Sequence, residues 1–408
     1  MAKTVKAKIS INGYIKDLAS FFALNGKRKK WIESGSTNVD MSDPVAELAK
    51  HLHPGLITSK IVKVTDETPS TKTFTLEPTD GKKLPLFYAG QYISVKYSID
   101  GRTTTRPFAI SSSPDLAVKK NQLEITLKKN PGGYVSTFVW ENWVEGATVL
   151  FDGPHGHIYY NGLRDSKHVV GIAGGSGVTI FRSIANDMLN GSGRPEKMTL
   201  VYGSSNASDI IYKDEFDALA AKSNGRISVI HVLSGDVPAD WSGETGFITA
   251  DLIAKLIPDY KTASFYVSGP AALYDAIEVA LDKLSISHPN RRIECYGESA
   301  NITRNKKYPQ DNAGKTYTLT VLFGVDKKEI PAISTETVAV ALERAGLAVD
   351  TQCRSGECGW CRSKLEAGSV WQRPESDGVR ARDKDSGYFH PCSAYPTSDI
   401  TVRVFTRI

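Results

Sequence analysis

Three of the five cysteines in this 408-residue chain fall within nine residues, in the segment DTQCRSGECGWCRSKLEAG. They are Cys353, Cys358 and Cys361, and Cys392 follows after thirty intervening residues. Thiols this close together can form disulfides, bind zinc or hold an iron–sulfur cluster, and each of these imposes a different fold on the surrounding chain.

Disulfides are disfavoured by the cellular location that the sequence suggests. The first 22 residues contain early lysines but no continuous apolar segment and no small-residue cleavage site, so we expect no secretion signal. No apolar run approaches ~18 residues, so we expect no membrane-spanning helix. A cytoplasmic, reducing location follows as an expectation, and disulfides are rare there.

The cysteine spacing C-x4-C-x2-C with a distant fourth cysteine is that of a [2Fe–2S] site, in which four thiolates hold two irons. A structural zinc site usually has two close ligand pairs, and only Cys358 and Cys361 form one here. His390 would be an additional zinc ligand, but we interpret it as a loop residue. Gly356 and Gly359 leave the backbone free to direct N–H groups at the sulfurs. The predicted metal ligands are Cys353, Cys358, Cys361 and Cys392.

The chain is too long for one hydrophobic core, so we expect several domains. The net charge of +5 is small for this length and gives no reason to expect a nucleic-acid partner. The expected segments are a helical N-terminal extension (1–55), an antiparallel barrel (56–160), a doubly wound parallel α/β domain (161–300), a linker (301–314) and a C-terminal domain (315–408).

Each boundary marks a change of pattern. Residues 56–160 contain short segments rich in β-branched residues and separated by turn residues, which is typical of a small antiparallel barrel. In residues 161–300, apolar runs alternate with helical patterns, which favours a parallel sheet. Residues 315–408 begin with a hairpin pattern and a helix and end with a strand after the cysteine loop.

The N-terminal extension is expected to be helical. SDPVAELAKHLH has helix-start signals at Ser42, Asp43 and Pro44, followed by a helical apolar pattern. Upstream, DLASFFALNGKRKKW is apolar and then basic. We favour a helix packed on its own protein over one that makes peripheral contact with a membrane surface or contacts a partner.

The C-terminal and barrel segments resemble known families. Residues 315–408, with YFHPCSAYPTSDITV around the fourth cysteine, resemble a plant-type ferredoxin domain, which implies a β-grasp fold. TTTRPFAISSSP resembles the R-x-Y-S flavin motif of the ferredoxin–NADP reductase superfamily. This resemblance implies that Arg106 contacts the flavin phosphate and Phe108 the isoalloxazine or ribityl chain. Phe108 and Ala109 replace the usual tyrosine and serine, so backbone N–H groups or Ser111 must supply the contact to flavin N5.

Two further segments resemble flavin-binding elements of the superfamily. PGGYVSTF is similar to its G-x-x-S phosphate loop, which implies that Gly133, Val135 and Ser136 contact the cofactor. FDGPHGHIYY is similar to the G-P-x-G segment that closes the flavin domain. These matches favour FAD, with FMN as the alternative.

The nucleotide-binding elements follow the flavin elements in the order typical of the superfamily. VVGIAGGSGVTIFRSI follows a predicted strand and opens a helix, the context in which a glycine loop binds pyrophosphate. It resembles AGG-x-G-x-T-P, and YVSGPAALYDAI resembles C-G-P-x-x-M with serine in place of cysteine. The residues assigned by this resemblance are Gly174, Gly175, Gly177, Thr179, Ser268, Gly269 and Pro270.

The remaining residues concern specificity and catalysis. VYGSSNASDIIYKDEF offers no arginine for a 2′-phosphate, and we expect Gly203 and Ser204 near the ribose. This favours NADH slightly over NADPH. The catalytic candidates are Thr179, Ser268 and Glu294, with Thr179 and Ser268 expected beside the nicotinamide. Glu294 or Tyr296 is expected either to face the flavin or to be an ordinary residue at a strand end.

Together the resemblances imply an NAD(P)H-dependent iron–sulfur flavoprotein reductase that passes electrons through flavin and a [2Fe–2S] cluster to an acceptor protein. An oxygenase is the first expectation for that acceptor. The alternatives are a stand-alone flavin or small-molecule reductase that uses the cluster internally, and a non-enzymatic electron carrier. The oligomeric state stays open.

Overall fold

The computed structural model describes residues 13–35, 43–52, 55–79, 81–190, 195–293, 298, 301–347, 349–374 and 377–405. The chain divides into two compact units, Met1–Ala49 and Lys50–Ile408, which are described separately. Within the described part of the chain, no helix combines the length and the apolar character needed to cross a bilayer.

The N-terminal unit contains helix α1 (Tyr14–Glu33), which buries none of its side chains. Helix α2 (Pro44–Leu52) begins in this unit and ends just beyond its boundary. The Asp43 carboxylate accepts hydrogen bonds from the backbone N–H groups of Val45 and Ala46, at 3.0 and 3.1 Å, so Asp43 caps α2.

The second unit begins with a six-stranded antiparallel sheet in the order β4-β3-β6-β1-β2-β5. Its strands are β1 (Ile57–Thr68), β2 (Thr71–Pro78), β3 (Tyr92–Ile99), β4 (Arg102–Ala109), β5 (Leu123–Lys128) and β6 (Thr148–His155). Ile110, just after β4, forms a β-bridge with Ile125 of β5, so the two outermost strands meet and the sheet closes into a barrel. Helices α3 (Pro114–Lys120) and α4 (Tyr134–Asn142) flank β5 in the sequence.

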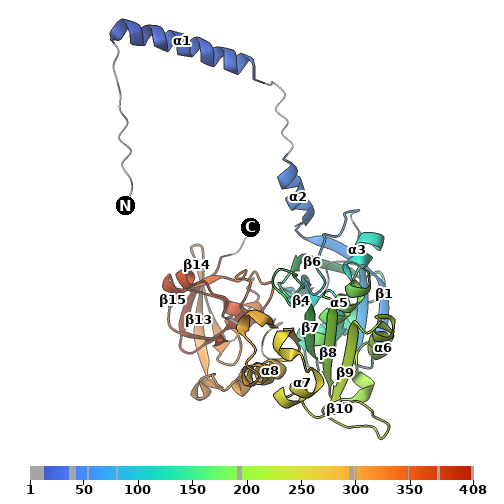
Figure 1. The fold of residues 1–408 in the computed structure, drawn as a ribbon. Helices are drawn as coiled ribbons and strands as arrows, with labels where there is room; N and C mark the ends of the chain where they lie inside the picture. Colours follow the sequence, from blue (N-terminus) through green and yellow to red (C-terminus); the bar gives the residue numbers. More distant parts are fainter. Residues whose placement is uncertain are drawn as a thin grey trace. The chain divides into compact units, whose positions relative to one another are not determined.

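A six-stranded parallel sheet follows, in the order β10-β9-β8-β7-β11-β12. Its strands are β7 (His168–Gly174), β8 (Lys197–Ser204), β9 (Ile227–Leu233), β10 (Glu244–Thr245), β11 (Ser264–Ser268) and β12 (Arg291–Ile293). Strands β7, β8, β9 and β10 of this sheet are labelled in Figure 1. Strands β8, β9 and β10 lie on one side of β7, and β11 and β12 lie on the other. The strand order therefore reverses between β7 and β11. This position is the topological switch point, where ligands bind in doubly wound folds.

Helices cover both faces of this sheet because consecutive strand residues point to opposite sides. Val169 packs with α5 (Thr179–Asn190) and α6 (Lys213–Lys222), whereas its neighbour Val170 packs with α7 (Ala250–Leu256) and α8 (Ala271–Lys283). Both valines are fully buried, so the sheet is the middle layer of a doubly wound domain. The predicted fold class is confirmed for this part of the chain.

The barrel and the parallel domain are joined by a buried polar contact. Arg182 of α5 donates to a Glu124 carboxylate oxygen of β5 at 2.6 Å, and its guanidinium lies 4.6 Å from the centre of the Tyr212 ring. The Tyr212 hydroxyl is 2.8 Å from the Thr73 hydroxyl of β2. Arg182 and Tyr212 of the parallel domain thus bind Glu124 and Thr73 of the barrel. These contacts hold the two domains on either side of one cleft.

The C-terminal domain has a five-stranded sheet in the order β14-β13-β19-β15-β17 and a separate β16-β18 pair. Its elements are β13 (Thr316–Phe323), β14 (Asp326–Ile333), α9 (Val338–Arg344), β15 (Ser363–Ala367), β16 (Val370–Gln372), α10 (Ala381–Asp385), β17 (Tyr388–Phe389), β18 (Ala394–Pro396) and β19 (Ile400–Arg403). The first and last strands, β13 and β19, are parallel neighbours, and α9 packs on this sheet. This is the predicted β-grasp arrangement.

The segment predicted to be a linker packs on the C-terminal domain. Ile302 and Tyr308 are buried against Tyr395. The Asn312 amide donates to the Pro396 carbonyl at 2.9 Å. The connection between the parallel domain and the β-grasp domain is therefore held to the surface of the latter.

Candidate functional site

A cleft of about 940 Å³ lies between the barrel and the parallel sheet, at the switch point beside β7 and β11. This volume is near the upper end of the range for small-molecule sites, which suits a site that must hold both a flavin and a nicotinamide.

Most of the residues predicted to bind cofactor line this cleft. The barrel contributes Arg106, Phe108, Ala109, Gly133, Val135 and Ser136. The parallel domain contributes Gly174, Gly175, Gly177, Thr179, Gly203, Ser204, Ser268, Gly269 and Pro270. Segments more than 150 residues apart in the sequence therefore meet at one place.

One predicted residue, Ser111, is not among the described residues that line the cleft. Ser111 is fully buried, and its hydroxyl accepts a hydrogen bond from the Thr126 hydroxyl at 3.1 Å. Thr126 itself lines the cleft, so it is the hydroxyl that β5 brings to the site. Thr126 belongs to an ordinary alternating strand pattern that matches no binding motif, so the sequence analysis could not identify it. Glu294 and Tyr296 lie outside the described residues.

Three helices point their N-terminal ends at the cleft. The first turn of α4 lines it through Tyr134 and Ser136, that of α8 through Ala272 and Leu273, and α5 through Thr179 after a 3₁₀ turn at Gly175–Val178. None of these three helices has an acidic residue in its first turn. Free N–H groups and the helix dipole make such ends attractive to anions, as the pyrophosphates of FAD and NAD require.

Glycine is required at two positions of the loop after β7. Gly175 has a φ of +53°, a conformation that other residues adopt only with strain. At Gly177, a Cβ atom would lie 2.1 Å from the Ser268 carbonyl oxygen at the end of β11. The loop therefore packs directly on the end of β11, with no room for a side chain at Gly177.

Arg106 is a desolvated cation in the wall of the cleft. Its Nη1 donates to the Thr104 hydroxyl and to the Thr105 carbonyl, both at 2.7 Å. Burial lowers the pKa of the Arg106 guanidinium and nearby Arg354 lowers it further, although the group remains charged because arginine does not deprotonate in proteins. A buried cation facing a cleft fits a phosphate group.

Two of the three catalytic candidates, Thr179 and Ser268, are among the described residues of the cleft. The Thr179 hydroxyl donates to the Ser176 carbonyl at 2.9 Å. Ser268 is the last residue of β11 and its hydroxyl group is buried, with the residue 1% exposed. Both residues line the same cleft as the glycine loop.

The cysteine loop directs backbone N–H groups at the sulfur atoms. The N–H groups of Ser355 and Cys358 point to the Cys353 sulfur, and that of Trp360 points to the Cys358 sulfur, each at 3.4 Å. Cys353, Cys361 and Cys392 are buried, whereas Cys358 is exposed. The sulfurs of Cys361 and Cys392 lie 3.4 Å apart.

The thiols influence one another strongly. Hydrogen bonding from Cys358 and then Cys392 lowers the pKa of Cys353 far below its usual value. The same interactions with Cys353 raise the pKa of Cys358 and of Cys392. One thiolate thus opposes the formation of the others, and several thiolates together require a compensating metal charge.

The surroundings of these thiols fit a [2Fe–2S] cluster better than zinc. Among the described residues, no three cysteine, histidine or acidic side chains converge on a single ion position. A two-iron cluster spreads its four thiolates over two metals, so it does not need that convergence. His390 lies 2.5 Å through Nδ1 from the Gly356 carbonyl, so it holds the loop backbone. The buried Ser355 hydroxyl interacts with the Cys353 thiol and contributes to the lowering of its pKa, so it lies beside the predicted ligands.

These sites define a flavin-dependent oxidoreductase that uses a pyridine nucleotide and carries an iron–sulfur centre. Three family models match the chain in this order: an oxidoreductase FAD-binding domain at 58–160, an oxidoreductase NAD-binding domain at 172–278 and a 2Fe-2S iron-sulfur cluster binding domain at 324–397.

Similar proteins share this arrangement over most of the chain. The glycine betaine monooxygenase reductase subunit of Chromohalobacter salexigens is 25% identical over 352 residues, which are 84% of this chain and 94% of that protein. The ferredoxin reductase component of the 3-ketosteroid-9-alpha-monooxygenase of Mycobacterium tuberculosis is 26% identical over 351 residues, 83% of this chain and 93% of that protein. The structure of phthalate dioxygenase reductase aligns with a TM-score of 0.61 and 19% identity, covering 86% of this chain and 98% of that one.

The chain is therefore a ferredoxin-reductase-type flavoprotein with a C-terminal [2Fe–2S] domain, as the sequence motifs predicted. It is an NAD(P)H-dependent oxidoreductase, and its cofactors are FAD, a pyridine nucleotide and a [2Fe–2S] cluster.

Proposed function

We propose that this chain is the reductase component of an oxygenase system and that its acceptor is a separate oxygenase protein. The observation that carries the proposal is the exposure of Cys358, while the other three predicted ligands are buried. A cluster held by these thiols has one edge at the surface, where a protein acceptor can dock. The similarity to oxygenase reductase subunits over more than four-fifths of the chain supports this choice.

The residues of the cleft have distinct roles in this proposal. When bound, FAD accepts a hydride from the nicotinamide and the cluster carries electrons singly. Arg106 and the N-terminus of α4 hold the flavin phosphates. The Gly174–Gly177 loop holds the nucleotide pyrophosphate, and Thr179 and Ser268 orient the nicotinamide. Catalysis by these residues consists of positioning, because the chemistry belongs to the cofactors.

NADH is the proposed electron donor. The basic residues among those described as lining the cleft are Arg106, Lys128 and Lys129, all in the barrel. On the nucleotide side the described lining includes Ser204, Ser205 and Ser234, which offer hydroxyl groups but no guanidinium for a 2′-phosphate. A higher kcat/KM for NADPH than for NADH would contradict the assignment.

The relay order is tested with Cys361→Ser, which replaces a thiolate ligand by a harder and poorly ionised one. The variant should lose most of its iron while keeping FAD, because the flavin and nucleotide domains have their own cores. NADH oxidation with a dye that takes electrons from flavin should persist. Reduction of cytochrome c, a one-electron protein acceptor, should fall at least tenfold.

Two outcomes would refute the relay. If the two activities survive alike, electrons leave from the flavin, and a stand-alone reductase is the better description. If both collapse in a folded, FAD-loaded variant, the proposed order of transfer is wrong. The oxygenase itself is identified by comparing candidate oxygenase proteins as acceptors and measuring product formation.

The N-terminal segment is proposed to make peripheral contact with an anionic membrane surface. Residues 1–35 contain eight lysines and arginines and two acidic residues, a net charge of +6, whereas the whole chain has +5. In α1, five apolar side chains lie at helical spacing and each is at least 44% exposed: Tyr14, Ile15, Leu18, Phe21 and Phe22. Lys27 to Lys30 follow as a basic run. Aromatic and basic residues on one helix suit the boundary of a lipid layer.

A cytoplasmic location belongs to the same proposal, because thiols that hold iron need a reducing compartment. The anionic leaflet of a membrane faces that compartment.

A further inference from the structure

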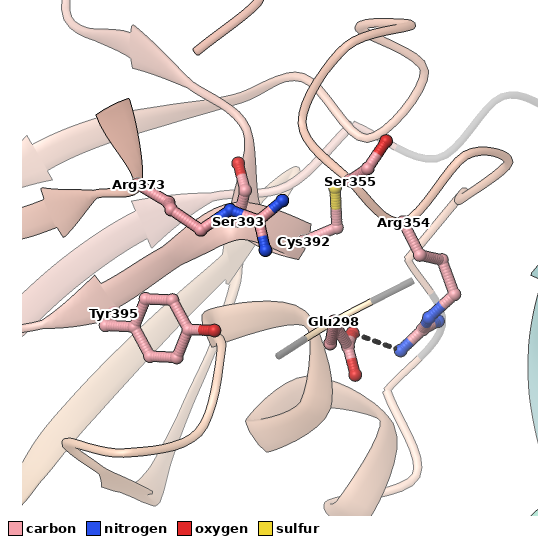
Figure 2. A pocket seen from close by; sticks show the side chains of 7 residues that line it. All are labelled: Glu298, Arg354, Ser355, Arg373, Cys392, Ser393 and Tyr395. Atoms are coloured by element: carbon pink, nitrogen blue, oxygen red, sulfur yellow. Dashed lines mark hydrogen bonds and ion pairs between the residues drawn. The ribbon is translucent and has the colours of Figure 1, made fainter. Parts of the chain in front are cut away.

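Arg354 directly follows the first predicted cluster ligand, Cys353, and combines two features that are unusual for an arginine in a loop. Its φ is +53°, although it is not a glycine, and its side chain is completely buried. Figure 2 shows the Arg354 guanidinium turned towards Glu298, with Ser355 and Cys392 close by. A strained backbone and a buried charge at one residue both require compensation by specific partners.

Two carboxylates supply that compensation. Arg354 binds Glu343 of α9 through two hydrogen bonds, from Nη1 at 2.6 Å and from Nη2 at 2.9 Å. Nη2 also donates to Glu298 at 2.6 Å (Figure 2). The geometry with Glu343 is the bidentate one that gives arginine pairs their strength and direction. Arg354 thus ties the cysteine loop to α9 and to the segment that leaves the nucleotide domain.

The same carboxylate reaches the flavin barrel. Glu343 accepts a hydrogen bond from the Thr104 hydroxyl of β4 at 2.9 Å, although the two residues are 239 positions apart. The Thr104 hydroxyl in turn accepts from Nη1 of Arg106, the predicted flavin-phosphate contact, at 2.7 Å. Nη1 of Arg354 also donates to the Thr104 hydroxyl at 3.4 Å, so Thr104 links Arg106 to Arg354 both directly and through Glu343.

A second set of contacts runs parallel to the first. The Thr105 hydroxyl of β4 donates to the Thr351 carbonyl at 2.9 Å. The Gln352 amide donates to the Asp152 carboxylate of β6 at 3.2 Å. Thr351 and Gln352, which directly precede the first cluster cysteine, are thus fastened to barrel strands β4 and β6.

We propose that Arg354 is a positioning residue for electron transfer: through Glu343 and Thr104 it fixes the cysteine loop against the flavin-binding strand β4. This inference rests on the proposed relay from flavin to cluster and names what sets the separation of the two centres. Small displacements of reacting groups cost large factors in rate, so loosening the contact slows cluster reduction. Thr104, Glu343 and Arg354 are not among the described residues that line the cleft, so hydride transfer there does not depend on them.

The test compares variants that loosen the contact with one that leaves it intact. Glu343→Gln and Thr104→Val remove parts of the bridge, and neither residue adjoins a cysteine. Arg354→Met removes its centre. The matched control is Arg344→Met, also on α9, which breaks an ion pair with Glu336 and a hydrogen bond to the Pro331 carbonyl on a partly exposed side chain. Each protein is purified with FAD and iron and mixed with NADH in a stopped-flow instrument.

In Glu343→Gln and Thr104→Val, flavin reduction should stay within twofold of the wild type, while cluster reduction slows at least tenfold. Hydrogen–deuterium exchange of the oxidised protein, measured without NADH, should rise in residues 102–109 and 349–357. The control should change neither measurement. If Arg354→Met does not fold or loses iron, the other two variants still decide the question.

The outcomes separate this inference from the relay on which it rests. If the wild type itself fails to reduce its cluster, the relay is wrong. If the wild type reduces it and the iron-loaded variants do so at the same rate, the role of Arg354 is wrong. Equal slowing of flavin and cluster reduction would also overturn it, because it would indicate general damage instead of a lost alignment.

Discussion

Arg106 is the residue whose role can be tested most directly, because it is a cation in the wall of the cleft. Arg106→Ala should weaken FAD binding, since a charge-assisted hydrogen bond contributes about 1.5–3 kcal/mol. This corresponds to a roughly 10- to 100-fold increase in the Kd for FAD. The measurement is FAD retention after dilution and reconstitution of the apoprotein.

Arg102 provides the matched control for this substitution. It lies on the same strand, β4, but its side chain is exposed. Arg102→Ala should therefore leave the Kd for FAD unchanged. If Arg106→Ala binds FAD as tightly as Arg102→Ala does, the flavin phosphate lies elsewhere in the cleft.

Thr126 and Arg354 are two residues whose roles could not be identified from the sequence. The cysteine ligands and glycines could be recognised because their chemistry fixes both residue type and spacing. Thr126 could not, because its place in the cleft depends on the pairing of β5 with β2 and on the burial of Ser111 behind it. The bridge from Arg354 to Thr104 joins residues 250 positions apart, and no local pattern encodes such a contact.

Among the elements, the loop between β7 and α5 is the most sensitive to change. In Gly177→Ala, the new Cβ would collide with the Ser268 carbonyl, so the loop must move away from β11. The N–H groups would then leave their positions for the pyrophosphate. We expect the KM for NADH to rise at least tenfold, while FAD content stays unchanged.

Gly162→Ala controls for the loss of glycine itself. The nearest atoms to a Cβ at Gly162 are 3.8 Å away, in ordinary contact distance, and φ there is not positive. This variant should have the KM of the wild type. A normal KM in Gly177→Ala would mean that the loop does not bind the nucleotide.

At the level of elements, prediction from sequence succeeded where the pattern was local. The alternation of apolar runs with helices indicated the parallel sheet, and the hairpin and helix of the C-terminal domain were recognised in order. The folding of residues 301–314 onto Tyr395 and Trp371 was not predicted, because its polar composition hides two buried side chains, Ile302 and Tyr308. Their partners lie 63 to 93 residues further along the chain.

For the molecule as a whole, the charge distribution leads to a prediction about the N-terminal unit. Without residues 1–35 the chain would have a net charge of −1, so its affinity for anionic surfaces resides almost entirely in that segment. The full chain should bind vesicles containing phosphatidylserine but not vesicles of phosphatidylcholine alone. High salt should weaken binding, because it screens the basic residues.

Charge reversal at Lys27, Arg28, Lys29 and Lys30 should reduce vesicle binding at least tenfold, since each basic residue near the surface contributes about 1 kcal/mol. The control reverses four exposed lysines of the second unit: Lys83, Lys119, Lys120 and Lys327. A chain that begins at Lys50 should not bind vesicles but should keep FAD, iron and NADH oxidation, because none of the described cores uses a residue before 57. Equal vesicle binding by both charge-reversed proteins would indicate that α1 contacts a protein partner instead.

The uneven exposure of the four cysteines has a consequence for how the protein matures. Cys353, Cys361 and Cys392 are at most 4% exposed, and among the four predicted ligands Cys358 alone is exposed. Cys361 and Cys392 pack against Ala339 of α9, so a scaffold protein that delivers a preformed cluster must act before the β-grasp domain closes around these thiols. Cells that make this chain faster than they supply clusters should accumulate FAD-loaded, iron-free protein that later delivery does not rescue.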